Sequence, residues 1–152
     1  MIGVGVLALD DLARRIEELT KTKVKVGAFG DKFYPDGTQL AEVVVTHEFG
    51  AIQKKIPSRP FMRPALADSK ALMAGEALKQ LNDGKEAGQI GSFLGAFLVG
   101  AMQKKIRDLH TPVLRPLTIE NRLKRGVTSI KPLIDSGYMR DSLTFNVDSD
   151  ND

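Results

Sequence analysis

The chain lacks cysteine and tryptophan and has only two histidines among its 152 residues. Without cysteine it cannot form disulfides, thiolate nucleophiles or cysteine-ligated zinc and iron–sulfur sites. Two histidines are too few for an ordinary histidine-rich metal site. Aromatic residues make up only 6% of the chain, which is little for stacking on bases or sugars. These absences indicate a protein of a reducing compartment without redox chemistry, and they favour no particular function.

Long apolar runs are also scarce. The longest stretch without a charged residue spans residues 87–103 and contains four glycines. As a helix it would be about 25 Å long, shorter than the ~30 Å hydrocarbon core of a bilayer. The start of the chain has no basic residue before its apolar run and no small-residue cleavage site after it. We therefore expect no signal peptide and no membrane span, and a buried or inter-subunit helix at residues 87–103.

The overall composition is that of an ordinary globular protein, with 42% hydrophobic residues, 27% charged residues and a net charge of +3. A chain of this length can bury roughly 68–70% of the surface that its unfolded form exposes, which is enough for one core. We expect a single domain over residues 1–147. Residues 148–152, with Asp148, Asp150 and Asp152, are expected to form an acidic, flexible tail.

Hydrophobic periodicity predicts the main elements. Leu9, Leu12, Ile16 and Leu19 recur at helical spacing and predict an amphipathic first helix. Alternation over residues 23–28 predicts a strand, and Pro35-Asp36-Gly37 predicts a turn. Further expected elements are a helix capped by Thr38 and ending at Gly50, an extended segment at 51–60, a helix from Pro60 or Pro64 to about Leu81, a helix from about Ile90 to Leu109, a short helix at 118–124, a helical turn or two at 138–142 and a final strand at 143–147.

Three glycines, Gly88, Gly91 and Gly95, fall on one face of the predicted helix that ends at Leu109. Each costs roughly 1 kcal/mol of helix stability relative to alanine, so such a stripe indicates that another backbone approaches closely. Packing within the subunit and a contact between subunits both fit this pattern.

The letters of several enzyme motifs occur without the context that their chemistry needs. The G-x-G-x-x-A at residues 3–8 has no strand before it, which a dinucleotide-binding turn requires. His47-Glu48 lacks the second histidine of a zinc-protease helix at position 51. The chain has neither a calcium-loop spacing nor a Gly-x-Ser-x-Gly elbow. We therefore expect no enzyme, no cofactor and no metal.

Two stretches are basic and nearly free of acids. Residues 49–67 contain four basic residues and no acid, and residues 104–131 contain eight basic residues with Asp108 and Glu120 as the acids. Such stretches form solvated faces, or they contact phosphates or acidic protein surfaces. The second stretch consists of Lys104, Lys105, Arg107, Arg115, Arg122, Lys124, Arg125 and Lys131.

The sharpest pattern is His47-Glu48-Phe49-Gly50, a short gap, and then Ile56–Leu66 with the sequence IPSRPFMRPAL. It predicts the end of a helix, a proline-pinned extended run and the start of another helix. Arg59 is held extended by the proline after it, and Phe61 is placed as an apolar anchor.

These letters resemble a family of tailed-bacteriophage virion proteins, variously called minor tail, tail-completion, neck or virion-morphogenesis proteins. That family carries H/N-E-F-G, a short gap and I-P-x-R-P-F-x-R-P. Residues 132–143, PLIDSGYMRDSL, are similar to its block P-L-x-D-T-G-x-L-x-x-S-I, with Ser136 in place of threonine and Tyr138 in place of a common arginine. Residues 114–126 are similar to its intermediate P-L-x-x-x-T-I block, and the three blocks occur in the expected order.

The resemblance implies an α+β fold, a small antiparallel sheet flanked by several helices, in a ring-forming subunit. Its function would be structural and non-enzymatic: tail completion and head–tail joining at the neck or tail top, as a homo-oligomeric, hexamer-like ring. The expected neighbours are connector and tail-tube proteins, with genomic DNA passing through the lumen without sequence readout and no membrane. The protein would be assembled in the host bacterial cytoplasm and reside in the virion.

The resemblance also marks family-motif residues that are candidates for the subunit interface. They are Glu48, Phe49, Gly50, Pro57, Arg59, Pro60, Phe61, Arg63, Pro64, Pro132, Leu133, Asp135, Gly137 and Ser142. On this interpretation, changing Arg59 or Phe61 to alanine impairs ring formation more than it lowers subunit stability. Two alternatives remain at this point: a tail terminator protein, and a nucleic-acid-binding protein without sequence specificity that uses residues 104–131.

Overall fold

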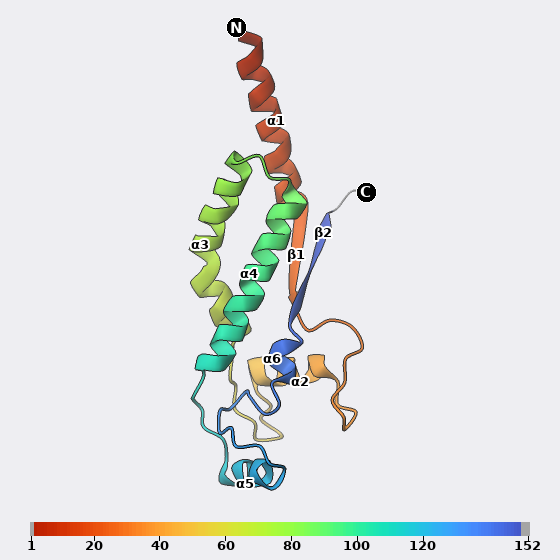
Figure 1. The fold of residues 1–152 in the computed structure, drawn as a ribbon, viewed down its shortest axis with the longest axis vertical. Coiled ribbons are helices and arrows are strands. Elements are labelled where there is room, and N and C mark those ends of the chain that lie inside the picture. The colour runs from red at the N-terminus through yellow and green to blue at the C-terminus, as the bar shows by residue number, and fades with distance from the viewer. Residues whose placement is uncertain (1, 150–152) are drawn as a thin grey trace.

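The computed structural model describes the backbone of residues 2–149 and the side chains of residues 8–148. Within this range the chain forms six helices and one two-stranded antiparallel sheet, which confirms the α+β expectation. The elements are α1 (Ile2–Lys21), β1 (Thr22–Gly27), α2 (Leu40–Phe49), α3 (Met62–Asn82), α4 (Ala87–Asp108), α5 (Pro116–Lys124), α6 (Tyr138–Asp141) and β2 (Thr144–Ser149). Figure 1 shows α2, α5 and α6 gathered at the end of the molecule opposite the N-terminus.

Helix α4 is the centre of the fold, because it packs against α3 and also against both strands (Figure 1). A Cβ atom added at Gly95 would lie 2.4 Å from Cδ2 of Phe145, and one added at Gly91 would lie 2.9 Å from Cγ1 of Val147. Glycine at these two positions lets the helix approach the sheet closely. The expected glycine face thus serves packing within the subunit at Gly91 and Gly95, and the subunit-contact alternative is wrong for them.

The sheet consists of β1 and β2 in antiparallel register, from Thr22 opposite Ser149 to Gly27 opposite Thr144. Its outer face is exposed and polar, and Lys25 Nζ lies 2.5 Å from an oxygen of Asp148. A two-stranded sheet is marginal in water, so the cover that α4 provides is needed. Asp148 lies within β2, opposite Lys23, so it belongs to a strand and not to the expected tail. The other two aspartates of the expected tail, at 150 and 152, lie outside the described residues.

Helix α1 begins at Ile2, well before the helical periodicity at Leu9. Residues 2–8 contain no polar side chain, so hydrophobic spacing gives no sign of where that helix starts. Figure 1 shows the N-terminal part of α1 extending beyond the rest of the molecule. Further along α1, Arg15 Nη2 donates to the carbonyl oxygens of Leu81 (2.7 Å) and Lys85 (2.9 Å), and so satisfies acceptors at the end of α3.

The prediction that Thr38 caps α2 is wrong. The helix begins at Leu40 with Gln39 at its N-cap, and no side chain bonds the cap. Thr38 is bound into the preceding turn, because its N–H donates to Asp36 (2.9 Å) and its carbonyl accepts from Tyr34 (2.8 Å). An aspartate that bonds the backbone two residues on is a common turn device, and here it takes Thr38 away from the helix.

The segment 51–60, expected to be extended throughout, is extended only in part. Ala51 and Ile56 exchange backbone hydrogen bonds around a tight turn. The pinned run follows at residues 57–61, and Pro64 lies in the first turn of α3 as expected. Pro116 begins α5 at its N1 position, two residues before the predicted start, because that position needs no N–H.

One hydrophobic core joins α2, α6 and the loop before α6 to the start of α3 and the C-terminal half of α4. It is formed by Leu40, Val44, Phe61, Ala65, Leu98, Met102, Ile106, Leu133, Met139 and Leu143. Phe61, Leu40 and Ile106 are among its fully buried side chains. Within residues 2–149, no helix is both long enough and apolar enough to cross a membrane.

Candidate functional site

The three blocks that carry the family resemblance fold together at one end of the molecule. We call this end the motif module and define it as residues 40–61 and 112–143. It contains α2, α5, α6 and the loops between them, at the bottom of Figure 1. Because blocks far apart in the sequence meet here, the motif module is the candidate functional site.

Glu48 closes the N-terminus of α3. Its side chain is buried, and its carboxylate accepts the N–H groups of Phe61 (2.9 Å), Met62 (2.9 Å) and Arg63 (3.0 Å). Burial alone would raise the pKa of Glu48, but these backbone bonds and the Arg63 side chain outweigh burial and lower the pKa. A carboxylate from α2 thus caps α3, which has no side-chain cap at its own N-cap residue.

Gly50 ends α2 with a φ of +77°. A Cβ atom at this position would lie 2.8 Å from the nitrogen of Ser58 and 3.0 Å from the carbonyl oxygen of Ile56. Ser58 Oγ also donates to the carbonyl oxygen of Glu48 at 2.9 Å. Only glycine combines this φ with such a close approach of backbone. The glycine of H-E-F-G is therefore required for the return of the chain beside α2.

Arg59 braces the end of α2 against a distant loop. Its N–H donates to the carbonyl oxygen of His47 (2.7 Å), while its guanidinium donates to those of Pro112 (2.8 Å) and Val113 (3.0 Å). The residue is only 5% exposed. Among the described residues, no acidic side chain forms an ion pair with it. The first sequence block is thereby fixed to the segment that leads into the second.

Seven of the fourteen motif residues expected at a subunit interface are buried inside the subunit. Phe61 is fully buried in the core, and Arg59 is nearly so. For these side chains burial favours a structural role over a contact with another subunit, so alanine at either position should also lower subunit stability. Pro132, Leu133, Gly137 and Ser142 are buried as well.

Three motif residues do reach the surface. Phe49 is 63% exposed, and the Arg63 side chain is 61% exposed and stacks over the Phe49 ring at 4.6 Å from its centroid. Pro57 is also exposed, whereas Pro60 and Pro64 are half-buried. Phe49, Pro57 and Arg63, which we call the exposed motif surface, are the motif residues that lie exposed on the outside of the subunit.

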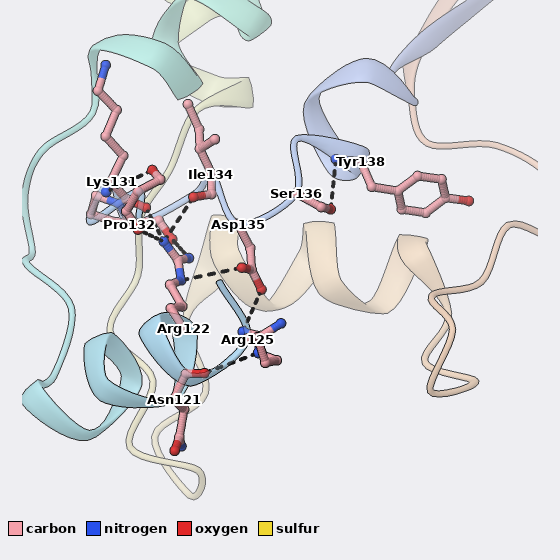
Figure 2. A network of polar contacts seen from close by, with 10 residues as sticks. Asn121, Arg122, Arg125, Lys131, Pro132, Ile134, Asp135, Ser136 and Tyr138 are labelled. Atoms are coloured by element: carbon pink, nitrogen blue, oxygen red, sulfur yellow. Dashed lines mark hydrogen bonds and ion pairs between the residues drawn. The ribbon is translucent and has the colours of Figure 1, made fainter. Parts of the chain in front are cut away.

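Arg122 organises the third block in the same way as Arg59 organises the first. Its guanidinium donates to the carbonyl oxygens of Ser129 (2.9 Å), Lys131 (2.8 Å), Ile134 (2.9 Å) and Pro132 (3.3 Å), as Figure 2 shows. Its Nε lies 3.8 Å from Asp135, which also accepts a hydrogen bond from Arg125 at 3.0 Å. The irregular loop from 129 to 135 thus obtains from one arginine the donors that a sheet would otherwise supply.

Gly137 and Ser136 start the short helix α6. Gly137 has a φ of +83° at the N-cap, a conformation that glycine adopts without strain. The N–H of Tyr138 donates to Ser136 Oγ at 3.3 Å (Figure 2), so the serine that replaces the family's threonine keeps a hydroxyl at this position.

A cavity of about 420 Å³ lies in the motif module between α2, the turn at residues 54–57, α5 and the loop at 132–139. A second hollow, of about 590 Å³, shares Tyr34, Ser136 and Tyr138 with it. The two tyrosine rings meet edge to face with their centroids 5.1 Å apart. The paired rings therefore stand where the two hollows adjoin.

The cavity wall is strongly polar on one side, where His47, Arg59, Arg122 and Asp135 line it. Burial, and then the guanidinium groups of Arg59 and Arg122, lower the pKa of His47 to about 4, so its ring is neutral at pH 7. His47 Nδ1 and Asp135 Oδ1 are buried without a hydrogen-bond partner in the described part of the chain. Unpaired buried polar atoms are uncommon, which makes this wall chemically unusual.

Most basic side chains in the stretch at 104–131 have a partner among the described residues. Lys104 pairs with Asp108, Lys105 with Asp68, Lys124 with Glu120 and Arg125 with Asp135, while Arg115, Arg122 and Lys131 donate to backbone carbonyls. Seven of its eight basic side chains thus have partners, so the stretch is not a free cationic patch.

Sequence reasoning missed three residues of the site. The letters mark His47 as the first residue of H-E-F-G and Arg122 as one of the basic residues of 104–131, and Tyr34 stands just before the predicted turn at 35–37. None of the three was predicted to line a cavity. Backbone carbonyls are the acceptors for Arg122, and they leave no mark in the amino-acid letters. The one available sign of its role was that Arg122 is a charged residue within the second block of family resemblance, residues 114–126.

No family model, curated protein or solved structure matches the chain. Among the described residues, no group of three or more histidine, aspartate or glutamate side chains is placed to hold a metal ion.

Proposed function

We propose that the chain is a structural subunit of a tailed-bacteriophage virion, at the neck or tail top, where copies form a ring that completes the tail and joins it to the head. The observation that carries the proposal is the convergence of the three resembling blocks in one motif module. Glu48, Arg59 and Arg122 hold that module together through backbone groups. Blocks that fold into one unit are the result expected if they belong to one family pattern.

The module also has the physical character of a docking element. Its loops have little regular structure, yet buried arginines fix them through several hydrogen bonds each. Loops that are already ordered lose less conformational entropy when a partner binds them. A rigid loop cluster at one end of an elongated subunit therefore suits assembly better than turnover of a substrate.

A closed ring requires two different surfaces of one subunit to meet. The exposed motif surface is one candidate, since Phe49 and Arg63 are accessible there. The part of α1 that extends beyond the body is the other candidate (Figure 1). Figure 1 shows α2 and the start of α3 well away from the N-terminal end of α1, so the two surfaces do not meet within one copy and are free to meet between copies.

Binding of nucleic acid through residues 104–131 is less favoured. The counterion release that drives such binding needs cationic side chains that are free to contact phosphate. Here most of those side chains are already bound within the chain.

The test is to inactivate the gene in the phage or prophage that encodes it and to view the lysate by electron microscopy. We expect filled heads and tails of normal length that are not joined, and complementation with the wild-type gene restores joined particles. Tails of irregular length would instead indicate the terminator position.

Two further measurements complete this test. Mass spectrometry of purified wild-type particles should detect the chain, and purified protein mixed with tails should form rings at one tail end. Infectious, joined particles that lack the chain would contradict the proposal.

A further inference from the structure

The cavity of the motif module has more buried positive charge than its own residues balance. Arg59 has no acidic partner among the described residues, and Arg122 shares Asp135 with Arg125. Two buried guanidinium groups, those of Arg59 and Arg122, thus line the cavity beside one carboxylate, Asp135, which also pairs with the exposed Arg125. Buried charges are ordinarily paired, because an unpaired one loses its hydration without compensation. This excess favours an anionic occupant.

The entrance to the cavity is also positively charged. Lys54, Lys55 and Arg115 line it and are exposed, and Asp36 is the acid on that side. Lys54 has a loose pairing with Glu42 at 3.6 Å, at the surface. An approaching anion is therefore attracted by the rim before it reaches the buried arginines.

The polar wall also contains a hydrogen-bond donor, the ring of His47. His47 is neutral at pH 7, so one of its ring nitrogens carries a proton, and its buried Nδ1 has no hydrogen-bond partner among the residues that the structure describes. Asp135 Oδ1 is unpaired too, but Arg122 and Arg125 balance the charge of that carboxylate. An anion can therefore bind to the Arg59 and His47 side of the wall without facing an unbalanced negative charge.

We propose that the cavity receives an acidic side chain of a partner protein, whose carboxylate binds Arg59 and His47 while a neighbouring apolar residue rests in the hollow beside Tyr34 and Tyr138. A partly enclosed cavity with an adjoining aromatic hollow suits an extended peptide that carries both kinds of side chain. Duplex DNA presents its phosphates to open surfaces and supplies no apolar side chain for the second hollow. The proposed function enters this inference only in the identity of the partner, which would be another virion protein. The binding of a carboxylate in the cavity does not depend on it.

The experiment is a titration of the ¹⁵N-labelled full chain, followed by NMR, with three probes. They are the blocked peptide acetyl-Leu-Asp-Leu-amide, its neutral counterpart acetyl-Leu-Asn-Leu-amide, and a short DNA duplex. We expect the aspartate peptide to shift resonances of the cavity-lining residues in a saturable way, with a dissociation constant of about 1 mM. The asparagine peptide should bind about tenfold more weakly, because it leaves the buried arginine charge unpaired.

Two variants locate the effect. Arg59→Gln removes the buried charge and should weaken the aspartate peptide about tenfold. Since that variant can fail to fold, Lys55→Glu at the exposed rim provides an independent test and should weaken binding about threefold. Lys70→Glu, an exposed residue of α3 outside the cavity, makes the same change of charge and should leave binding unchanged.

Equal binding of the two peptides, or no binding of either, would overturn the inference. So would shifts of the cavity resonances by the duplex alone, since the cavity would then bind phosphate. The titration uses the isolated chain and the test of the proposed function uses phage particles, so either proposal can fail without the other.

Discussion

Single charged residues hold the motif module by bonding backbone groups rather than one another. Glu48 accepts N–H groups at the start of α3, while Arg59 and Arg122 donate to carbonyl oxygens of loops. Hydrogen bonds to charged groups are stronger than neutral ones, and they satisfy backbone that has no helix or sheet partner. Because each of these side chains serves several backbone groups, single substitutions here should have large effects.

Glu48→Ala should lower the free energy of unfolding by about 2–4 kcal/mol, because it leaves N–H groups at the start of α3 without their acceptor. Urea denaturation followed by circular dichroism measures the change. Glu42→Ala on the same helix is the matched control. Glu42 is exposed and pairs only loosely with Lys54, so its loss should cost no more than about 0.5 kcal/mol. Similar losses in the two variants would contradict the capping role of Glu48.

His47 should make stability depend on pH between its unfolded and folded pKa values. Burial and two arginines lower its folded pKa from 6.5 to about 4, so below pH 6.5 the unfolded chain binds a proton that the folded chain does not. Stability is therefore full above about pH 7 and falls as the pH decreases toward 4.

We expect a loss of about 2 kcal/mol between pH 7 and pH 5, measured by urea denaturation at each pH. His47→Gln should largely remove this dependence, whereas His110→Gln, at the exposed second histidine, should retain it. The same pH slope in both variants would show that His47 does not cause it.

At the scale of elements, α4 makes the fold possible by lying close to the sheet. Gly95 has no room for a methyl group, because Phe145 occupies the place where a Cβ would be. Gly100, on the same helix, has nothing within 4 Å of the corresponding position. The two glycines therefore separate the cost of close packing from the intrinsic cost of glycine in a helix.

Gly95→Ala should destabilise the protein by about 1–3 kcal/mol through overpacking, while Gly100→Ala should stabilise it by about 0.5–1 kcal/mol. Thermal unfolding of the two variants and of the wild type measures the loss of stability in one and the gain in the other. If both substitutions stabilised the protein, the contact between α4 and the sheet would be looser than the structure has it.

Elements whose patterns are local were predictable. The proline start of the helix that ends near Leu81, the glycine-rich helix predicted from about Ile90 to Leu109 and the alternation in both strands all follow from residues a few positions apart. The start of α1 and the cap of α2 were not predictable in this way. The first lies in a run without polar residues, and the second was decided by Asp36 taking Thr38 into a turn.

At the scale of the whole molecule, one core links the motif module to the helices and sheet. Phe61 lies in that core at the start of α3, where the two parts join. Because no separate core divides the described residues, the module should not unfold by itself.

The two tyrosines make this testable. The only tyrosines of the chain, Tyr34 and Tyr138, pack against each other beside the module's cavity, and the chain has no tryptophan. Near-UV circular dichroism thus reports on this end of the molecule, and far-UV circular dichroism reports mainly on the long helices α3 and α4. We expect coincident urea midpoints, and Phe61→Leu should move both midpoints together. Separate transitions would show that the motif module is an independent folding unit.

By itself, the sequence determined most of the elements and the three blocks of family resemblance, because these depend on spacing along the chain. The α+β class was an expectation from that resemblance. Only the tertiary structure decided what the motif residues do. It buried Arg59 and Phe61, which had been assigned to an interface, and it placed Arg122 and His47 in one cavity wall. The physical reason is that backbone carbonyls and N–H groups, the partners of these side chains, are identical at nearly every position. Which of them meets a given arginine or glutamate is therefore decided by the fold and not by the letters.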